Sequence, residues 1–349
     1  MHLITKTAFA AAVSLALTGT SWAQTIGPSG ETATPSAEVV VADSDIATLK
    51  AGNHTAALVW HDQSDFVSAV SAGATDEFAR FGIEVVATTN AAFDTAKQRS
   101  DIETVLAKEP SIVLALPLDP VASAAAFKEA TETGVQLVFL SNVPAGYEHG
   151  THYASIVTDD LFQMGKQAAD ALAADLGGKG KVGWIFHDAT YYVTNQRDNA
   201  FKTTIENDYP EMEIVATAGI SDPARAEEIA NAMLLKHPDL AGVYVTWAGP
   251  AEGVLSALRS NGNKSTKIVT LDLSEPIALD MVRGGNVSAI VADEAYELGR
   301  AMAASAARGL LGQDSPAFVV APAITVNADN VQEGWQTSLH RDAPKSLTQ

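Results

Sequence analysis

The feature that most constrains this chain is the regular alternation of short apolar runs with longer stretches of helical spacing. The runs are rich in β-branched side chains and carry no polar alternation, which is typical of strands buried on both faces of a parallel sheet. They cover 56–60, 83–87, 112–116, 135–140, 182–186, 213–218, 242–246, 267–271 and 287–291. The alternation predicts an α/β chain of βαβ units with right-handed crossovers and helices on both faces of the sheet.

The stretches between the runs carry helix start and stop signals. An apolar face at helical spacing covers 66–81, and Gly82 follows as a C-terminal stop. An aspartate and a proline at 222–223 are typical of an N-cap and a first helical position ahead of a helix over 226–236. Because these units exceed one doubly wound sheet, we expect two Rossmann-like lobes. We place the joint between them near 141–158, the longest stretch with neither periodicity.

The first 23 residues differ in character from the rest of the chain. Lys6 precedes an apolar run over 8–17, and the small residues at 21 and 23, three and one positions before Gln24, offer a cleavage site. The run is shorter than the ~18 apolar residues that a membrane-spanning helix needs. We therefore expect residues 1–23 to be a cleaved signal peptide of a periplasmic protein. Residues 24–54 are expected to form a lead-in, flexible over 24–36.

Composition excludes several function classes. The chain has no cysteine, and hence no disulfide, no thiol nucleophile and no cysteine metal site. A net charge of −20 and a pI near 4.6 argue against a nucleic-acid partner, which needs a basic surface. We find no phosphate loop, nucleophile elbow or dinucleotide fingerprint, and predict no catalytic residue and no cofactor. His149 and His152 have zinc-ligand spacing but no third ligand, so we interpret them as loop residues and expect no metal.

Polar and aromatic side chains gather just after the predicted strands. Ligands of open α/β sheets bind beyond the carboxyl ends of the strands, and in two facing lobes these ends meet at one cleft. Aromatic rings beside carboxylates and amides suit a neutral, polyhydroxylated ligand, because rings cover C–H faces and polar groups satisfy hydroxyls. The candidates at these positions are Trp60, His61, Asp62, Phe66, Ser141, Asn142, Tyr192, Asn195, Arg197, Asp222, Trp247, Asp272 and Asp293.

Several candidates also have a structural interpretation, which the residues alone leave open. Trp60 and Trp247 could close the core at a sheet edge, and Asp222 could act only as a helix N-cap. One of the two tyrosines at 191–192 could lie on the surface. The His-Asp pairs at 61–62 and 187–188 have the spacing of a base and its orienting group, but no nucleophile or metal partner accompanies them.

The chain resembles the periplasmic sugar-binding proteins of ABC importers, in the ribose-binding class. The resemblance covers about 55–326 and rests on AALVWHDQSDFVSAVSAGA, IVLALPLDP, VFLSN, YYVTNQRDNAF, HPDLAGVYVTWAGPAEGVLSAL, KIVTLDLSEPIALDMVRGG and VSAIVADEAYELG. Cytoplasmic repressors of the lactose-repressor type share the pattern. They carry an N-terminal helix-turn-helix, whereas this chain begins with the predicted leader.

The resemblance implies a type I periplasmic binding protein fold, with hinge crossings near Thr158, Asp293 and Pro322. The N-terminal lobe would comprise 55–158 plus 294–321, and the C-terminal lobe 159–293 plus 322–349. It also implies a monomer that captures a small neutral carbohydrate or polyol and delivers it to an inner-membrane ABC permease with its ATP-binding subunit. The alternative is a sensory receptor for a sugar or an autoinducer-2-type ligand, which presents its closed lobes to a chemoreceptor or a histidine kinase.

Position by position, the resemblance adds Leu116 to the candidates and implies ligand contacts at Trp60, Phe66, Leu116, Ser141, Asn195 or Arg197, Asp222, Trp247, Asp272 and Asp293. The ribose-type pattern has Asp-Arg where Ser141-Asn142 stand, and Asn at the positions of Leu116 and Trp247. These departures remove a clamp on hydroxyls, so ribose in its usual pose is not expected.

The strand ends also predict how the ligand is bound. We expect Trp60, Phe66 or Trp247 to stack on it. Several aspartates and a single arginine follow the strands, so we expect a ligand that is neutral or carries at most a positive group.

Overall fold

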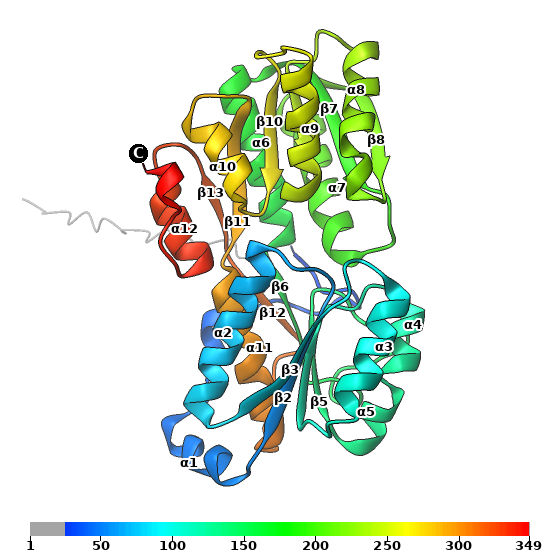
Figure 1. Cartoon of the computed structure of the whole chain (residues 1–349), viewed down its shortest axis with the longest axis vertical. Coiled ribbons are helices and arrows are strands. Elements are labelled where there is room, and N and C mark those ends of the chain that lie inside the picture. The colour runs from blue at the N-terminus through cyan, green and yellow to red at the C-terminus, as the bar shows by residue number, and fades with distance from the viewer. Residues whose placement is uncertain (1–24, 349) are drawn as a thin grey trace, which may run out of the picture.

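The computed structural model describes residues 25–348, so the predicted signal peptide lies outside the described residues. Figure 1 shows two lobes placed end to end, each built on a sheet with helices on both faces. The two-lobed α/β architecture predicted from the sequence is confirmed. Among the described residues, no helix combines the length and the apolar character needed to cross a membrane.

The N-terminal lobe contains a seven-stranded sheet in which every neighbouring pair is parallel. In spatial order its strands are β1 (Thr34–Pro35), β12 (Phe318–Ala321), β6 (Ser155–Asp159), β5 (Gln136–Leu140), β4 (Ile112–Ala115), β2 (Thr55–Trp60) and β3 (Glu84–Asn90). The accompanying helices are η1 (Ser36–Glu38), α1 (Asp43–Ala51), α2 (Asp65–Phe81), α3 (Thr95–Leu106), α4 (Pro120–Ala126), α5 (Lys128–Thr133) and α11 (Ala295–Leu310).

The C-terminal lobe contains a six-stranded sheet, parallel except for its edge strand β13. Its spatial order is β13 (Ala323–Val326), β11 (Val287–Asp293), β10 (Lys267–Leu271), β9 (Gly242–Val245), β7 (Lys179–His187) and β8 (Glu211–Ile220). Its helices are α6 (Leu161–Leu176), α7 (Tyr192–Asp208), η2 (Pro223–Arg225), α8 (Ala226–Lys236), α9 (Ala248–Ser260), α10 (Glu275–Val282), α12 (Val331–Leu339) and η3 (Lys345–Leu347).

All nine predicted strands are present. The strands that the sequence did not predict are β1 and three of the four strands at the hinge, β6, β12 and β13, among the described residues. The chain passes from one sheet to the other between β6 and α6, between β11 and α11, and between β12 and β13. In the ladders, Asp159 pairs with Ala321 and Asp293 pairs with Ala323. Two aspartates therefore lie on either side of Pro322, where the lobes join.

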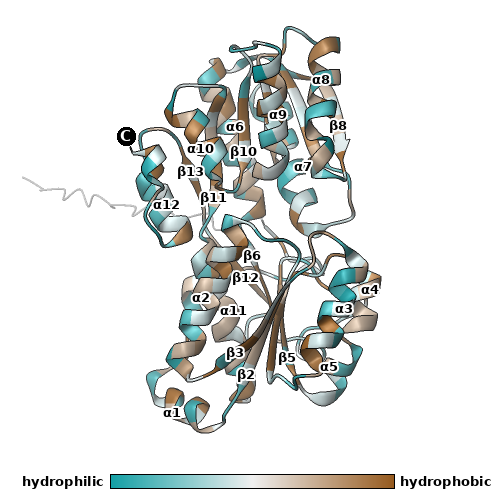
Figure 2. Ribbon diagram, viewed as in Figure 1, coloured by the Kyte–Doolittle hydropathy of each residue, from teal (hydrophilic) through white to brown (hydrophobic). Residues whose placement is uncertain are grey.

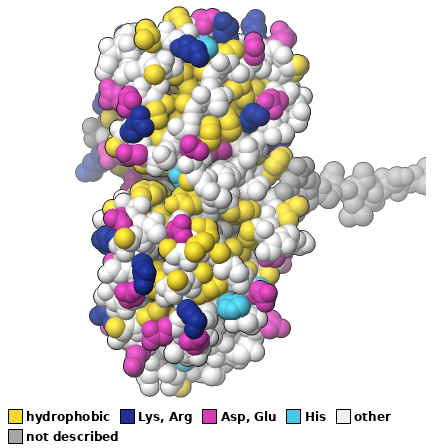
Figure 3. Space-filling model, turned by 90° about the vertical axis from the view of Figure 1, so that its right-hand side faces the viewer, with side chains coloured by type: hydrophobic (Ala, Val, Ile, Leu, Met, Phe, Trp, Pro, Cys, Tyr) yellow, Lys and Arg dark blue, Asp and Glu magenta, His cyan; other side chains and the backbone are white. Residues whose placement is uncertain are grey.

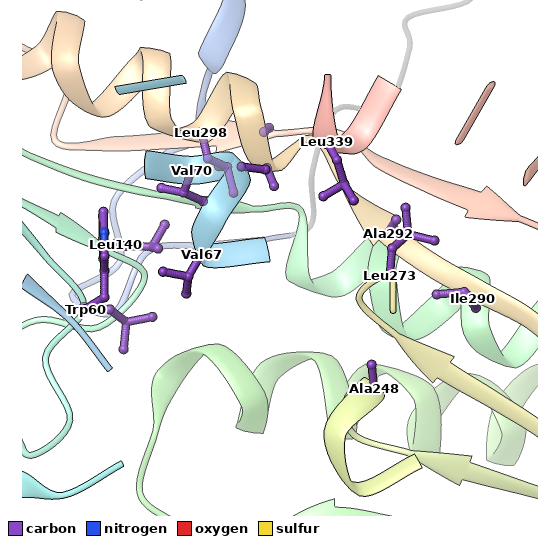
Figure 4. Packing of buried hydrophobic residues seen from close by; sticks show 14 of the residues in the cluster. Trp60, Val67, Val70, Leu140, Ala248, Leu273, Ile290, Ala292, Leu298 and Leu339 are labelled. Atoms are coloured by element: carbon purple, nitrogen blue, oxygen red, sulfur yellow. The ribbon is translucent and has the colours of Figure 1, made fainter. Parts of the chain in front are cut away.

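Alternation along the strands divides each core into two faces. Ala56, Leu58 and Trp60 of β2 pack in the cluster that contains residues of α2 and α11, whereas Ala57 and Val59 pack on the opposite face. Figure 2 shows the apolar strands enclosed by helices whose outer faces are hydrophilic. In Figure 4, Trp60 lies beside Leu140, inside this packing.

Two glycines allow α2 and α11 to cross closely. A Cβ atom on Gly73 would lie 1.9 Å from the carbonyl oxygen of Tyr296, and one on Gly299 would lie 1.9 Å from that of Val70. Only a residue without a side chain permits this approach. The crossing fixes α2, whose first turn reaches the cleft.

The prediction of a flexible segment over 24–36 is wrong for the residues that the structure describes. β1 pairs with β12 and so covers an open sheet edge. Thr25 is buried; its Oγ1 donates to Asp160 Oδ1 at 2.6 Å and accepts from the backbone N of Phe162 at 2.9 Å. The segment thus runs from the sheet of one lobe to the first turn of α6 in the other.

Candidate ligand-binding cleft

A cavity of about 650 Å³ lies between the lobes, within the ~300–1,000 Å³ typical of small-molecule sites. Figure 3 shows the waist at which the two lobes meet. Residues that follow strands of both sheets line the cavity. From the N-terminal lobe these include His61, Asp62, Phe66, Phe93, Leu116, Leu118, Ser141, Asn142 and Asp159. From the C-terminal lobe they include His187, Tyr191, Thr194, Arg197, Trp247, Asp272 and Asp293.

Arg197 is the buried cation of this cavity. Its Nη1 donates to Asp272 Oδ1 at 3.3 Å, and its Nη2 donates to the carbonyl oxygen of Thr246 at 3.0 Å. Burial disfavours the charged guanidinium, but nearby acidic groups, Asp272 first, outweigh it and raise the pKa of Arg197. A Cβ atom on Gly165 would lie 2.1 Å from the carbonyl oxygen of Arg197, so this glycine of α6 lets α7 pack closely enough to hold the arginine in place.

Asp198, the neighbour of Arg197, binds the strand ends together. It accepts hydrogen bonds from the backbone N of His187 at 2.8 Å, from Tyr244 Oη at 2.6 Å and from Thr246 Oγ1 at 3.0 Å. Burial raises the pKa of Asp198, and the hydrogen bond from Tyr244 opposes that effect. These bonds join β7, β9 and α7, so the wall of the C-terminal lobe is preorganised.

Ser141 and Asp272 adopt strained backbone conformations at equivalent places in the two lobes. Their φ angles are 58° and 64°, in the left-handed region that costs a non-glycine residue about 1–3 kcal/mol. Each follows the strand beside the hinge strand and donates its backbone N–H to that strand, to Val157 at 2.9 Å and to Val291 at 3.0 Å. Such strain, held by the surrounding fold, clusters at functional sites.

Asp159 and Asp293 form the floor of the cavity. Each is 2% exposed, and Asp159 Oδ1 and Asp293 Oδ2 have no hydrogen-bond partner among the described residues. Burial raises the pKa of Asp159 to about 7; Asp272 adds to this effect, and Arg197 opposes it. Burial, followed by the charge of Asp159, raises the pKa of Asp293 well above its usual range.

The two histidines of the cavity are held in the neutral form. Burial lowers the pKa of His61, and Asp62, at 3.4 Å from its Nε2, works against that shift. Burial and the charge of Arg197 lower the pKa of His187 to about 4. His187 Nδ1 lies 3.0 Å from Thr194 Oγ1. Neither ring therefore adds positive charge to the cavity near neutral pH.

Aromatic rings reach across the cleft. Phe93 stacks on Trp247 with ring centroids 6.3 Å apart, and His187 meets the same indole edge-on at 4.9 Å. Ala92 and Phe93 both have left-handed φ angles, 51° and 60°, which turn the Phe93 ring toward the opposite lobe. The sequence analysis missed Phe93, because the predicted strand ended at 87 whereas β3 runs to Asn90. An aromatic residue just beyond the true strand end was the available signal.

The structure places ten of the predicted residues on the cavity wall: His61, Asp62, Phe66, Leu116, Ser141, Asn142, Arg197, Trp247, Asp272 and Asp293. Besides the bonds of Arg197 and Asp272 given above, Ser141 and Asn142 are held by bonds within the protein. Ser141 Oγ pairs with Thr158 Oγ1 at 2.8 Å, and Asn142 Oδ1 accepts from the backbone N of Val193, in the other lobe, at 3.4 Å.

Trp60 lies in the core and not on the cavity wall, which is the structural interpretation that the sequence left open; of the three rings expected to supply a stacking contact, Phe66 and Trp247 line the cavity. It is 1% exposed, and strand alternation turns its side chain toward α2 while the next residue, His61, reaches the cleft.

Tyr192, Asn195 and Asp222 also lie off the wall. Tyr192 donates its hydroxyl to the carbonyl oxygen of Ile26 and packs against Phe318, whereas Tyr191 lines the cavity. On α7 the cavity-lining face carries Thr194 and Arg197, and Asn195 points elsewhere. Asp222 is an exposed N-cap that accepts from the backbone N of Ala224 at 3.0 Å.

The described residues contain no group of three or more His, Asp and Glu side chains that could hold a metal ion. His149 Nε2 lies 3.0 Å from the carbonyl oxygen of Ser315, and His152 Nδ1 accepts from the backbone N of Glu148 at 3.0 Å. The His152 ring is thus bonded within its own loop, and the His149 ring is bonded to the segment between α11 and β12.

Comparison with known proteins gives consistent findings. The family model for the periplasmic binding protein domain matches residues 56–314. The ribose import binding protein of Bacillus subtilis is 25% identical over 247 residues, 70% of this chain and 77% of that protein. A solute-binding protein from Agrobacterium vitis, bound with α-D-tagatopyranose, has a similar structure, with a TM-score of 0.75 and 22% identity over 83% of this chain and 100% of its own. One from Mycobacterium smegmatis, with bound glycerol, has a TM-score of 0.71 and 24% identity over 80% of this chain and 96% of its own.

Proposed function

Because this chain belongs to the periplasmic binding protein domain family, we propose that it is the solute receptor of an ABC importer for a small carbohydrate or polyol. Lobe closure around the ligand would shift the hinge equilibrium through contacts that form only in the closed state. The closed protein would then deliver the ligand to the inner-membrane permease. The names of the relatives, an import binding protein and transporter solute-binding proteins, favour import over sensing.

The observation that carries this proposal is a set of buried polar atoms that face one cavity without partners. Asp159 Oδ1, Asp293 Oδ2, Arg197 Nε and His61 Nδ1 are buried and unpaired within the described chain, and their residues all line the cleft. Buried polar groups are nearly always hydrogen-bonded, so these atoms suit a ligand rich in donors and acceptors. Trp247 and Phe93 supply the apolar faces that the C–H surface of a sugar needs.

The charge of the cavity narrows the ligand class. Among the described residues that line the cavity, Arg197 is the one Lys or Arg, and it is already paired with Asp272. An anionic ligand would meet uncompensated carboxylates in a site from which water is excluded, at a cost of several kcal/mol. The proposed ligand is therefore neutral or positively charged, and not a sugar phosphate or a sugar acid.

A thermal-shift screen of sugars and polyols tests the proposal, because a ligand that binds only the folded state raises the midpoint. At least one panel member should raise it, and the matching phosphate or uronate should not. Ligand-induced quenching of tryptophan fluorescence should shrink in Trp247→Ala. A screen in which no sugar or polyol shifts the midpoint contradicts the proposal.

Uptake separates import from sensing. A strain that lacks this protein should lose uptake of the radiolabelled ligand, whereas the loss of a sensory receptor abolishes only the response. We further propose that the protein acts as a periplasmic monomer, binds no nucleic acid and releases its ligand chemically unchanged. N-terminal sequencing of the periplasmic fraction should begin at Gln24, and NMR of the released ligand should show the starting compound.

A further inference from the structure

The carboxylates of the cavity differ in whether other side chains of the protein supply them with a hydrogen bond or an ion pair. At the rim, Asp65 pairs with Arg341, and Glu252 accepts from Ser274 Oγ at 3.0 Å. Asp62 accepts from Ser64 Oγ at 3.3 Å. Deeper in the cavity, Asp272 accepts a hydrogen bond from Arg197.

The floor carboxylates Asp159 and Asp293 are exceptions. They lie on either side of Pro322, each 2% exposed, and each has a buried oxygen without a partner among the described residues. Among the described residues that line the cavity, Arg197 is paired with Asp272 and offsets the floor carboxylates only in part, and the two histidines are neutral. Two adjacent buried carboxyl groups cannot both ionise cheaply without a cation.

We propose that the ligand of this cleft carries a protonated nitrogen, and that this ammonium group binds against Asp159 and Asp293. The inference rests on the proposed function as a carbohydrate or polyol receptor and names the chemical class within it: an amino sugar or an amino polyol.

An ammonium group fits this floor better than a hydroxyl group or a metal ion. It offers three donors, enough to reach both unpaired oxygens, and its charge offsets the carboxylates. A hydroxyl group can donate only one hydrogen bond, and it brings no positive charge that would let both carboxyl groups ionise. The described residues form no metal-holding group. The rest of the ligand would lie between the rings of Phe93 and Trp247 and the Arg197–Asp272 pair.

The test is titration calorimetry of the purified protein with matched ligand sets at neutral pH. Each set contains an amine, its parent hydroxyl compound and its N-acetyl derivative, with D-glucosamine, D-galactosamine and an aminoinositol as the amines. At least one amine should bind ten times more tightly than both neutral partners. Asp159→Asn and Asp293→Asn should each weaken binding of that amine at least tenfold more than they weaken binding of its parent hydroxyl compound. Asp222→Asn, a carboxylate outside the cavity, serves as the matched control and should change neither.

The outcomes separate the two claims. If every neutral parent binds as tightly as its amine, the ammonium inference is overturned and the receptor function stands. The inference also fails if an amine binds more tightly but the floor variants bind it as wild type does. If no member of any set binds, both the inference and the proposed carbohydrate or polyol receptor are contradicted.

Discussion

The two lobes have the same order of core strands, yet their cleft walls carry different chemistry. β6 and β5 of the N-terminal lobe occupy the places of β11 and β10 in the C-terminal lobe. After β5 and β10 stand Ser141 and Asp272, both in the left-handed region and both bonded to the hinge strand. Ser141 gives the N-terminal lobe a neutral hydroxyl group that pairs within the protein. Asp272 gives the C-terminal lobe a carboxylate that is bound to Arg197.

The hinge strands themselves end alike, in Asp159 and Asp293. The backbone framework is thus duplicated, but the side chains differ. The charged groups that can bind a ligand lie mainly in the C-terminal lobe and at the hinge. The wall of the N-terminal lobe contributes mainly neutral and apolar groups, Phe93, Leu116 and Leu118 among them. The comparison teaches that strand position alone does not determine the role of a residue in the cleft.

The largest effect should come from breaking the charged pair of the C-terminal wall. Arg197→Met should lower the free energy of unfolding by about 3 kcal/mol, because Asp272, whose side chain is only 19% exposed, then loses the partner of its charge. Chemical denaturation measures this. The neutral counterpart, Ser141→Ala, should cost about 1 kcal/mol. Equal losses in the two variants would contradict the division of roles between the lobes.

A second contrast separates two tryptophans: Trp60, which ends β2, and Trp247, which lies between β9 and α9. Trp60→Leu should lower the free energy of unfolding by about 3 kcal/mol through lost core packing and leave ligand affinity within twofold. Trp247→Leu should do the opposite, with about tenfold weaker binding and little change in stability. Denaturation and calorimetry on both variants decide this. A loss of ligand affinity in Trp60→Leu without a loss of stability would show that the Trp60 ring contacts the ligand.

The hinge aspartates, one from each lobe, should lower the free energy of unfolding as the pH rises. The folded-state pKa of Asp159 is raised to about 7, so between about pH 4 and 7 the native state binds more protons than the unfolded state. The stability that this group contributes is therefore present below pH 4 and lost as the pH rises through 7.

Asp159→Asn and Asp293→Asn should each stabilise the ligand-free protein at pH 8, by about 1–3 kcal/mol, and by less at pH 5. Comparing each variant with wild type at each pH removes the opposite slope from His187, whose pKa is lowered to about 4. Thermal unfolding at both pH values measures the difference. If the variants are less stable than wild type at pH 8, burial of the two ionised carboxylates does not destabilise the ligand-free protein.

The smallest effect is expected at the contact between the lobes. Phe93→Ala removes the ring that stacks on Trp247, an interaction worth about 0.5–1.5 kcal/mol, so ligand affinity should fall about two- to tenfold. Phe93 is 40% exposed, so the unfolding midpoint should hardly change. Leu235→Ala, an exposed apolar residue of α8, is the control. An unchanged affinity in Phe93→Ala would mean that the stacked pair does not act in the ligand-bound state.

Local signals predicted much of this molecule. The β-branched runs became strands, Gly82 ended α2 with a φ of 71°, and Asp222 capped η2 ahead of α8. Three of the hinge strands, β6, β12 and β13, were missed, because they lie in segments without clear periodicity, whereas the fourth, β11, was predicted. The order imposed on residues 25–36 also escaped prediction, since it comes from pairing with a strand almost 300 positions away.

The sequence by itself determined the fold class and the set of strand ends from which the cleft is built, because both follow from periodicity along the chain. Only the tertiary structure decided which side chains enter the cleft. Trp60 and His61 are neighbours, as are Tyr191 and Tyr192. Trp60 is buried in the core and Tyr192 packs against it, whereas His61 and Tyr191 line the cavity. The physical reason is direction: one step along a strand reverses a side chain and one step along a helix turns it by about 100°, so the outcome depends on the residue at which each element begins and ends.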